Sequence, residues 1–229
     1  MSSARPGGQS GRPMSATLPP DSAVHRRDCV PLVVPPVTLE GHDVRLEPLR
    51  PEHAPALAAL CEDDIFTWFS SVLRTEADVA AFIDNACQAA ERGSERPFVI
   101  IERRTGAPVG TTRFLEIQRD HRTLEIGYTW LGRRVWRTRI NTECKYLLLR
   151  HAFESLGVMR VQFKTDKHNA RSRAAIERLG ARFEGVLRHH KLVRGGVVRD
   201  SAYYSVVDTE WPEVKVRLEG LLADGGARV

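Results

Sequence analysis

The sequence has few of the features that mark a secreted, membrane-spanning or metal-binding protein. Its four cysteines form no CxxC pair and have no histidine at a zinc-like spacing: they are Cys29, Cys61, Cys87 and Cys144. We therefore expect free thiols in a reducing compartment and no bound metal. No run approaches the ~20 apolar residues of a membrane span, and the N-terminus lacks the apolar core of a secretory signal. These absences predict a soluble, cytoplasmic protein with no membrane partner.

The composition is that of one folded domain with a tail. The chain has 229 residues, 42% of them hydrophobic, which is enough for one sizeable core. Its formal net charge is +5. This mild basicity fits an anionic ligand, and it leaves nucleic acid open as a partner without favouring it.

The chain divides into three parts. Residues 1–36 are rich in Ser, Gly, Pro and Arg and lack hydrophobic periodicity, so we expect a disordered extension, with a basic arm that touches RNA as the alternative. Met14 is a second candidate, besides Met1, for the start of translation. Residues 37–223 are expected to fold as one domain, and residues 224–229 to form a frayed tail.

Hydrophobic patterning and turn residues predict a mixed α+β fold. The expected strands are 44–49, 98–102, 109–117, 123–131, 160–165, 181–193 and 197–207. The expected helices are 51–61, 76–92, 141–156, 169–179 and 210–222. Short turns within 98–131 predict an antiparallel meander, and the strand–helix–strand unit 123–165 predicts one parallel pair joined by a right-handed crossover. The expected architecture is a mixed, mostly antiparallel twisted sheet of about seven strands flanked by helices.

The stretch from 124 to 156 organises this domain. Its strand alternates, with one face formed by Leu124, Ile126, Tyr128 and Trp130, and the other by Glu125, Gly127, Thr129 and Leu131. The helix is expected to begin at a cap formed by Asn141-Thr142-Glu143 and to end at Gly157.

The loop between this strand and helix is strongly basic. It carries four arginines, Arg133, Arg134, Arg137 and Arg139. Because a helix N-terminus offers unpaired backbone N–H groups and a positive dipole end, such a loop suits a phosphate or pyrophosphate group.

Six short motifs follow one another between residues 37 and 222. They are Leu46-Glu47-Pro48-Leu49, Val109-Gly110, the run 125–131 (EIGYTWL), Asn141-Thr142-Glu143 with its helix to Ala152-Phe153, Asn169-x-x-Ser172 leading to Leu179-Gly180-Ala181, and Glu210-Trp211. No single motif is specific, but their order and spacing are. Together they resemble the GNAT superfamily of acyl-CoA-dependent N-acetyltransferases, and within it the ribosomal-protein serine/alanine N-terminal acetyltransferase branch.

One loop departs from the family pattern. Members usually carry Arg/Gln-x-x-Gly-x-Gly/Ala before the central helix, whereas the matching run 134–139 has Arg137 and Arg139 at the two glycine positions. Glycine lets the backbone approach a pyrophosphate and adopt open dihedral angles. Either these arginines supplement a retained CoA site, or the site has drifted and binds CoA weakly; a solvated charge run is the third interpretation.

The resemblance implies where acetyl-CoA, the co-substrate, would bind. The central strands of this fold splay near the end of strand 124–131, and the acyl-pantetheine lies there as a pseudo-strand with its pyrophosphate on the following loop and helix N-terminus. The implied CoA-binding residues are Thr129, Trp130, Leu131, Arg134, Arg137, Thr138, Arg139, Ile140, Asn141, Thr142, Asn169 and Ser172.

The resemblance also implies two catalytic residues. Glu125 matches a common family glutamate and is the expected general base, with Glu116 in reserve; the alternative makes Glu125 a surface charge. Many relatives protonate the leaving thiolate with a tyrosine, but Ile176 occupies that position here. Ser172 is the nearest hydroxyl, and with Asn169 it would lie near the CoA sulfur; the alternative makes Asn169 only a helix cap.

The resulting function is an acetyl-CoA-dependent N-acetyltransferase acting on a protein N-terminus or a small amine. The alternative is a catalytically degenerate module whose Arg-rich loop binds RNA, ribosome or another anionic partner. A longer donor such as succinyl-CoA stays open, and so does the choice between monomer and homodimer. The acceptor would be set by loops 62–74 and 113–122 and by hairpin 187–203. His189 and His190, adjacent on a strand, face opposite ways and cannot easily chelate one ion.

Overall fold

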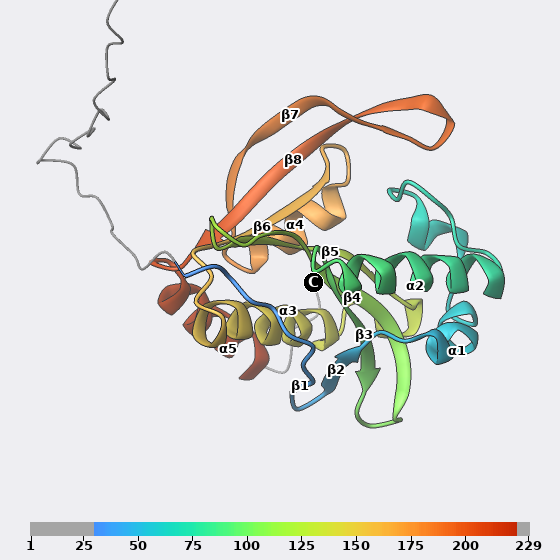
Figure 1. The fold of residues 1–229 in the computed structure, drawn as a ribbon, viewed down its shortest axis with the longest axis horizontal. Coiled ribbons are helices and arrows are strands. Elements are labelled where there is room, and N and C mark those ends of the chain that lie inside the picture. The colour runs from blue at the N-terminus through green and yellow to red at the C-terminus, as the bar shows by residue number, and fades with distance from the viewer. Residues whose placement is uncertain (1–29, 224–229) are drawn as a thin grey trace, which may run out of the picture.

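The structure, a computed structural model, describes residues 30–223 as one twisted sheet with helices on both faces (Figure 1). The strand order is β1-β2-β3-β4-β5-β6-β8-β7, and β5–β6 is the parallel pair among antiparallel neighbours. This confirms the predicted α+β class. The eighth strand, beyond the seven expected, is the two-residue β1. No helix within residues 30–223 is long and apolar enough to cross a membrane.

The elements follow the predicted order. The strands are β1 Leu39–Glu40, β2 Val44–Pro48, β3 Arg96–Glu102, β4 Ala107–Gln118, β5 Thr123–Leu131, β6 Arg160–Asp166, β7 Arg182–Val193 and β8 Val197–Val207. The α-helices are α1 Ala54–Ala58, α2 Glu76–Glu91, α3 Ile140–Arg150, α4 Ala170–Arg178 and α5 Trp211–Ala223. β7 and β8 extend as a long hairpin beyond the body of the sheet (Figure 1).

The sheet separates two hydrophobic cores because its strands alternate. On β3, Phe98 and Ile100 join the core that contains residues of α3, α4 and α5. Val99 and Ile101 join the core that contains residues of α1 and α2. Both faces of β3 are therefore buried, which explains its continuous apolar run.

The segment before β1 belongs to the folded part. Residues 30–36, which we assigned to the extension, pack on the body of the domain. Leu32 and Val34 are buried, and the Val34 carbonyl accepts a 2.8 Å bond from Arg96 Nε. The rest of the expected extension, and the expected tail 224–229, lie outside the described residues.

The ends of α2 and α3 test the predicted caps. Thr75 caps α2, since its hydroxyl accepts a 3.1 Å bond from the backbone of Asp78. The predicted cap of α3 is wrong: the helix begins at Ile140 and has no side-chain cap. It continues through a π-helical turn, His151–Ser155, before Gly157, whose φ of +62° suits the predicted glycine stop.

Glu143 explains why the predicted cap does not form. Its buried carboxylate accepts three backbone N–H bonds from residues 42–44, at 2.5 to 2.9 Å, and so is not available as a cap. The acid of the first turn thus ties the helix to the β1–β2 turn.

Candidate active site

The parallel strands β5 and β6 part after three residues. Thr123–Glu125 pair with 160–162, and beyond this point β5 stays paired with β4 while β6 stays paired with β8. Residues 126–131 of β5 therefore have one backbone edge with no strand partner in the described chain. This is the splay that the family resemblance implied.

A β-bulge lies in the splayed half of β5. Gly127 pairs with Arg113 and Trp130 with Thr111, so Tyr128 and Thr129 together oppose one residue of β4. Tyr128 has a positive φ of +47°.

The bulge overturns part of the predicted alternation. Tyr128 and Trp130 both lie on the α2 face, where Tyr128 contacts the Phe82 ring and Trp130 is in the α1–α2 core. Thr129 instead lies on the α3 face, where Ile126 and other strand neighbours are buried. The extra residue shifts the period-two pattern by one, which periodicity alone does not reveal.

Glu125 is buried beside the splay and is held by β6. Its side chain accepts bonds at Oε2 from Gln162 Nε2 (2.8 Å) and Lys164 Nζ (2.9 Å). Burial lowers the pKa of Lys164, but Glu125, Tyr203 and Glu116 together outweigh burial and raise that pKa overall. The reserve base, Glu116, lies 4.0 Å from the same lysine, so both candidate bases meet at one cation.

Gly127 makes room for the Glu125 carboxylate. A Cβ built on Gly127 would lie 2.9 Å from Glu125 Oε1 and 3.0 Å from a methyl group of Leu115. Oε1, the Glu125 oxygen that accepts neither of these two bonds, therefore lies against Gly127, next to the opening between the strands.

Three of the four loop arginines are already paired. Ion pairs join Arg133 to Asp64 (2.6 Å), Arg134 to Glu102 (2.8 Å) and Arg139 to Asp43 (3.0 Å). These pairs fold the loop onto the domain, so the arginines are not a simple solvated run.

Arg137 differs from the other loop arginines. It is exposed and has no ion pair within residues 30–223. Its φ is +59°, in the left-handed region that favours glycine. The backbone at Arg137 thus has a conformation that glycine adopts readily, at the position where the family pattern has its first glycine.

The start of α3 offers backbone donors to this loop. The first intrahelical backbone bond runs from Glu143 N to Arg139 O, and Ile140 N contacts Thr138 Oγ1 at 3.3 Å. Other amides in the first turn precede any intrahelical acceptor and are available to an anion.

Trp136 links the loop to α4. Its indole N–H donates to the Leu131 carbonyl (2.7 Å), so that carbonyl is occupied. The guanidinium of Arg171, on α4, stacks 4.1 Å from the Trp136 ring centroid. The predicted CoA-binding segments on β5, the loop and the start of α4 thus meet around this tryptophan.

Asn169 and Ser172 adopt the capping arrangement. Asn169 Oδ1 accepts a 3.1 Å bond from Ser172 N, as the alternative interpretation predicted. This leaves the Ser172 hydroxyl uncommitted to the cap. Ile176 is buried in the core on the α3 face. Thr142 Oγ1 accepts a 2.6 Å bond from Arg178, which holds α4 against α3.

Lys145, on α3, was not among the predicted site residues. It is 6% exposed, and its Nζ donates to Thr129 Oγ1 (2.5 Å) at the bulge. Burial lowers the pKa of Lys145 to about 8. The sequence did indicate that this lysine would be buried. Lys145 precedes Leu148 by three residues and Ala152 by seven, which places it on the apolar face of the predicted helix.

The hairpin brings polar groups to the face of the sheet that carries Glu125. His190 Nδ1 lies 2.9 Å from Ser201 Oγ, and its Nε2 lies 3.2 Å from the Tyr203 hydroxyl. Burial lowers the pKa of His190. His189 instead donates its backbone N–H to Asp200 (2.7 Å). The two histidines do not converge, and no metal-binding cluster of His, Cys, Asp and Glu occurs in residues 30–223.

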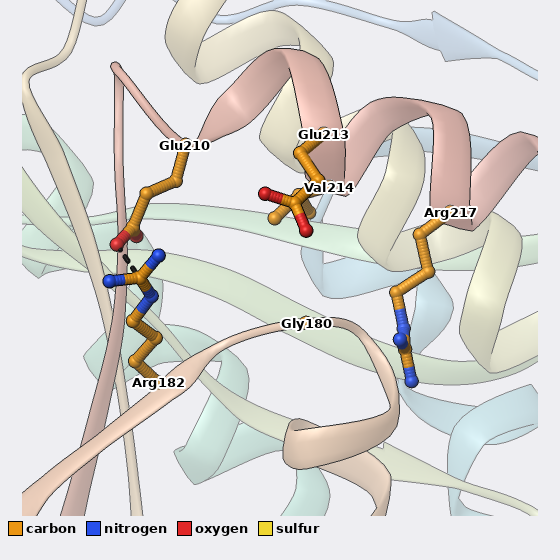
Figure 2. A pocket seen from close by; sticks show the side chains of 6 residues that line it. All are labelled: Gly180, Arg182, Glu210, Glu213, Val214 and Arg217. Carbon is orange, nitrogen blue, oxygen red and sulfur yellow. Dashed lines mark ion pairs between the residues drawn. The ribbon is translucent and has the colours of Figure 1, made fainter.

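A small hollow lies elsewhere, between α5 and the turn that joins α4 to β7 (Figure 2). Arg182 and Glu210 form a 2.8 Å ion pair at its side. None of the predicted site residues lines this hollow, so it is not part of the splay.

Comparison with known proteins agrees with this geometry. The acetyltransferase (GNAT) domain family matches residues 43–182. The N-acetyltransferase p20 of Bacillus licheniformis, named as uncharacterized, is 29% identical over 119 residues, or 52% of this chain and 66% of p20. YdaF of Bacillus subtilis, which carries the provisional name ribosomal N-acetyltransferase, is 33% identical over 106 residues, or 46% of this chain and 57% of YdaF. The matches span less than two thirds of each of these relatives.

Solved structures cover more of the chain. A GCN5-related N-acetyltransferase from Brucella melitensis has a TM-score of 0.80 and 31% identity, covering 87% of this chain and 94% of that one. RimJ of Mycobacterium smegmatis, in complex with CoA-disulfide, shares the fold with a TM-score of 0.71 and 23% identity, covering 83% and 96%.

The chain belongs to the acetyltransferase (GNAT) family. This confirms the predicted family and the predicted class of enzyme, an N-acetyltransferase domain.

Proposed function

We propose that this protein uses acetyl-CoA to acetylate a primary amine, by direct attack of the amine on the thioester. The parting of β5 and β6 carries the proposal. An extended pantetheine arm can pair with the free backbone edge of residues 126–130, as an added strand would. The RimJ relative bound to CoA-disulfide supports the same class of ligand.

The phosphates of CoA would meet the loop and the start of α3. The first-turn amides supply backbone donors, and two exposed cations without an ion pair in residues 30–223, Arg137 and Arg171, flank them. The paired arginines hold the loop in place. This favours the interpretation in which arginine supplements a retained CoA site.

Glu125 would accept a proton from the incoming amine, directly or through a water molecule. Lys164 and Gln162 fix Oε2 and leave Oε1 beside the opening. A backbone N–H of the bulge, near Thr129, would polarise the thioester carbonyl. Asn169 and Ser172 would contact the donor near its sulfur.

The acceptor is proposed to be a protein N-terminus, with a small amine as the second class. The provisional ribosomal name of YdaF supports the first class. His190 and Tyr203 lie on the face of the sheet that an acceptor would share with Glu125. The RNA-binding alternative is not proposed, because three loop arginines are held in ion pairs. Cytoplasmic location and oligomeric state stay predictions.

Turnover tests this function. Purified protein is incubated with acetyl-CoA and either short peptides with N-terminal serine or alanine, or small amines, and free CoA thiol is measured. We expect turnover with peptides, and a fall of about 10²-fold or more in kcat for Glu125→Gln. Glu91→Gln, at an exposed glutamate at the end of α2, is the matched control and should keep the parent activity. Binding of acetyl-CoA without turnover on any acceptor would overturn the proposed transfer.

A further inference from the structure

The ammonium group of Lys145 contacts the bulge of β5 from the face of the sheet that α3 covers. Its Nζ is bonded to Thr129 Oγ1, which lies 2.8 Å from Thr112 Oγ1 on β4. Both hydroxyl partners are neutral. The lysine is therefore anchored to the segment of β5 that we propose to hold the thioester, on the face of the sheet covered by α3.

The charge of Lys145 has no counter-charge in the described part of the chain. No carboxylate in residues 30–223 pairs with it, and its neighbour Glu143 is committed to the amides of residues 42–44. The titratable group that acts on it is the buried Cys144 thiol. A buried ammonium is costly unless an anion or several acceptors satisfy it, and Lys145 has one neutral acceptor. The arrangement suits an anion supplied by a ligand.

The chain lacks the usual donor for the leaving thiolate. Ile176 stands where many relatives have a tyrosine, and it is buried in the same core as the apolar side of α3. Lys145 reaches the splayed half of β5 from α3, so that segment has a proton donor although position 176 does not supply one.

We propose that Lys145 neutralises and protonates the thiolate that leaves during acyl transfer. This inference rests on the proposed function. The amine nitrogen forms a bond to the carbonyl carbon, and the carbon–sulfur bond breaks with its electron pair going to sulfur. The Lys145 ammonium gives its proton to that sulfur. The amine proton goes to Glu125, which then releases it to solvent, and neutral Lys145 takes a proton from solvent, so the net products are an amide and free CoA thiol.

The acidity of Lys145 fits this transfer. Burial lowers its pKa to about 8, close to the ~8.5 of an ordinary thiol. A proton donor whose pKa is near that of the leaving group works efficiently near neutral pH.

Two variants separate this role from a structural one. Lys145→Met keeps the volume and removes the charge, and Lys145→Arg keeps a cation. For each, calorimetry gives CoA affinity, thiolate absorbance gives the pKa of the bound CoA thiol, and steady-state kinetics gives kcat. In Lys145→Met we expect the bound thiol to be at least about tenfold less acidic and kcat to fall about tenfold or more, with CoA affinity changed only a few-fold. Lys145→Arg should recover part of both effects.

The experiments distinguish a failure of this inference from a failure of the proposed function. If the parent binds CoA and turns over, but Lys145→Met leaves the acidity of the bound thiol and kcat unchanged, this inference is wrong and the proposed function stands. If the parent does not bind CoA, the proposed function fails and takes this inference with it.

Discussion

At the scale of single residues, Gly127 shows how the site constrains its neighbours. The Glu125 carboxylate covers this glycine, so any side chain there would compete with the proposed base for space. The need for glycine comes from a side chain two residues away, and not from a special φ at Gly127 itself.

Replacing Gly127 by alanine should lower kcat by roughly tenfold to a hundredfold. The added methyl group would push the Glu125 carboxylate out of its position beside the opening between the strands. Acetyl-CoA affinity and folding should be retained. Gly220→Ala is the matched control, since a Cβ there meets nothing within 4 Å. Parent-like kcat in Gly127→Ala would show that the position of the Glu125 carboxylate does not limit turnover.

Lys145 should make stability depend on pH in a defined direction. Its folded-state pKa of about 8 lies below the ordinary 10.5, so between these values the unfolded chain binds more protons and stability rises with pH. Below pH 8 the buried charge costs on the order of 3 kcal/mol. Urea unfolding should show Lys145→Met to be more stable than the parent at neutral pH, with a smaller gap near about pH 9.5. A gap that does not change with pH would contradict the depressed pKa.

Some residue roles could be predicted and others could not. The sequence showed that Arg137 and Arg139 replace two glycines of the family pattern, but it did not show that Arg137 would adopt a positive φ of +59°. The partners of Glu125 could not be predicted, because Gln162 and Lys164 reach it from a strand that lies beyond α3 in the chain.

At the scale of elements, strand positions were predictable from alternation and helices from turn-bounded periodicity. The bulge at Tyr128 was not, because an extra residue in one strand is defined only by its pairing with β4. Asn141-Thr142-Glu143 resembled a cap, but the tertiary contact of Glu143 with the β1–β2 turn decided the outcome.

The link between α3 and the β1–β2 turn should depend on Glu143. Glu143→Ala leaves three backbone N–H groups without their charged acceptor, which should lower the free energy of unfolding by about 2–4 kcal/mol. Urea denaturation measures this, and Glu91→Ala, an exposed glutamate at the end of α2, is the control. If Glu143→Ala lowered the free energy of unfolding by no more than Glu91→Ala does, water would be replacing the carboxylate without cost.

At the scale of the whole molecule, the order of elements and the parallel crossover were sufficient to predict a mixed α+β domain, and the six motifs then predicted the family fold. The polar face that we propose for the acceptor was predictable only in outline. The resemblance implied hairpin 187–203, but the contacts that bring this hairpin beside β5 and β6 form only in the fold. The packing of residues 30–36 was missed for a related reason. Their apolar side chains alternate with prolines and exposed residues, and only the folded domain gives them a surface to cover.

The central claim is that the splay and its loop bind acetyl-CoA. Calorimetric titration of the parent with acetyl-CoA, beside Arg137→Ala and Arg139→Ala, tests it most directly. We expect a parent Kd on the order of micromolar and a loss of about tenfold in Arg137→Ala. The change in Arg139→Ala should be much smaller, because that arginine is paired with Asp43. Absence of binding by the parent up to millimolar acetyl-CoA would contradict the account.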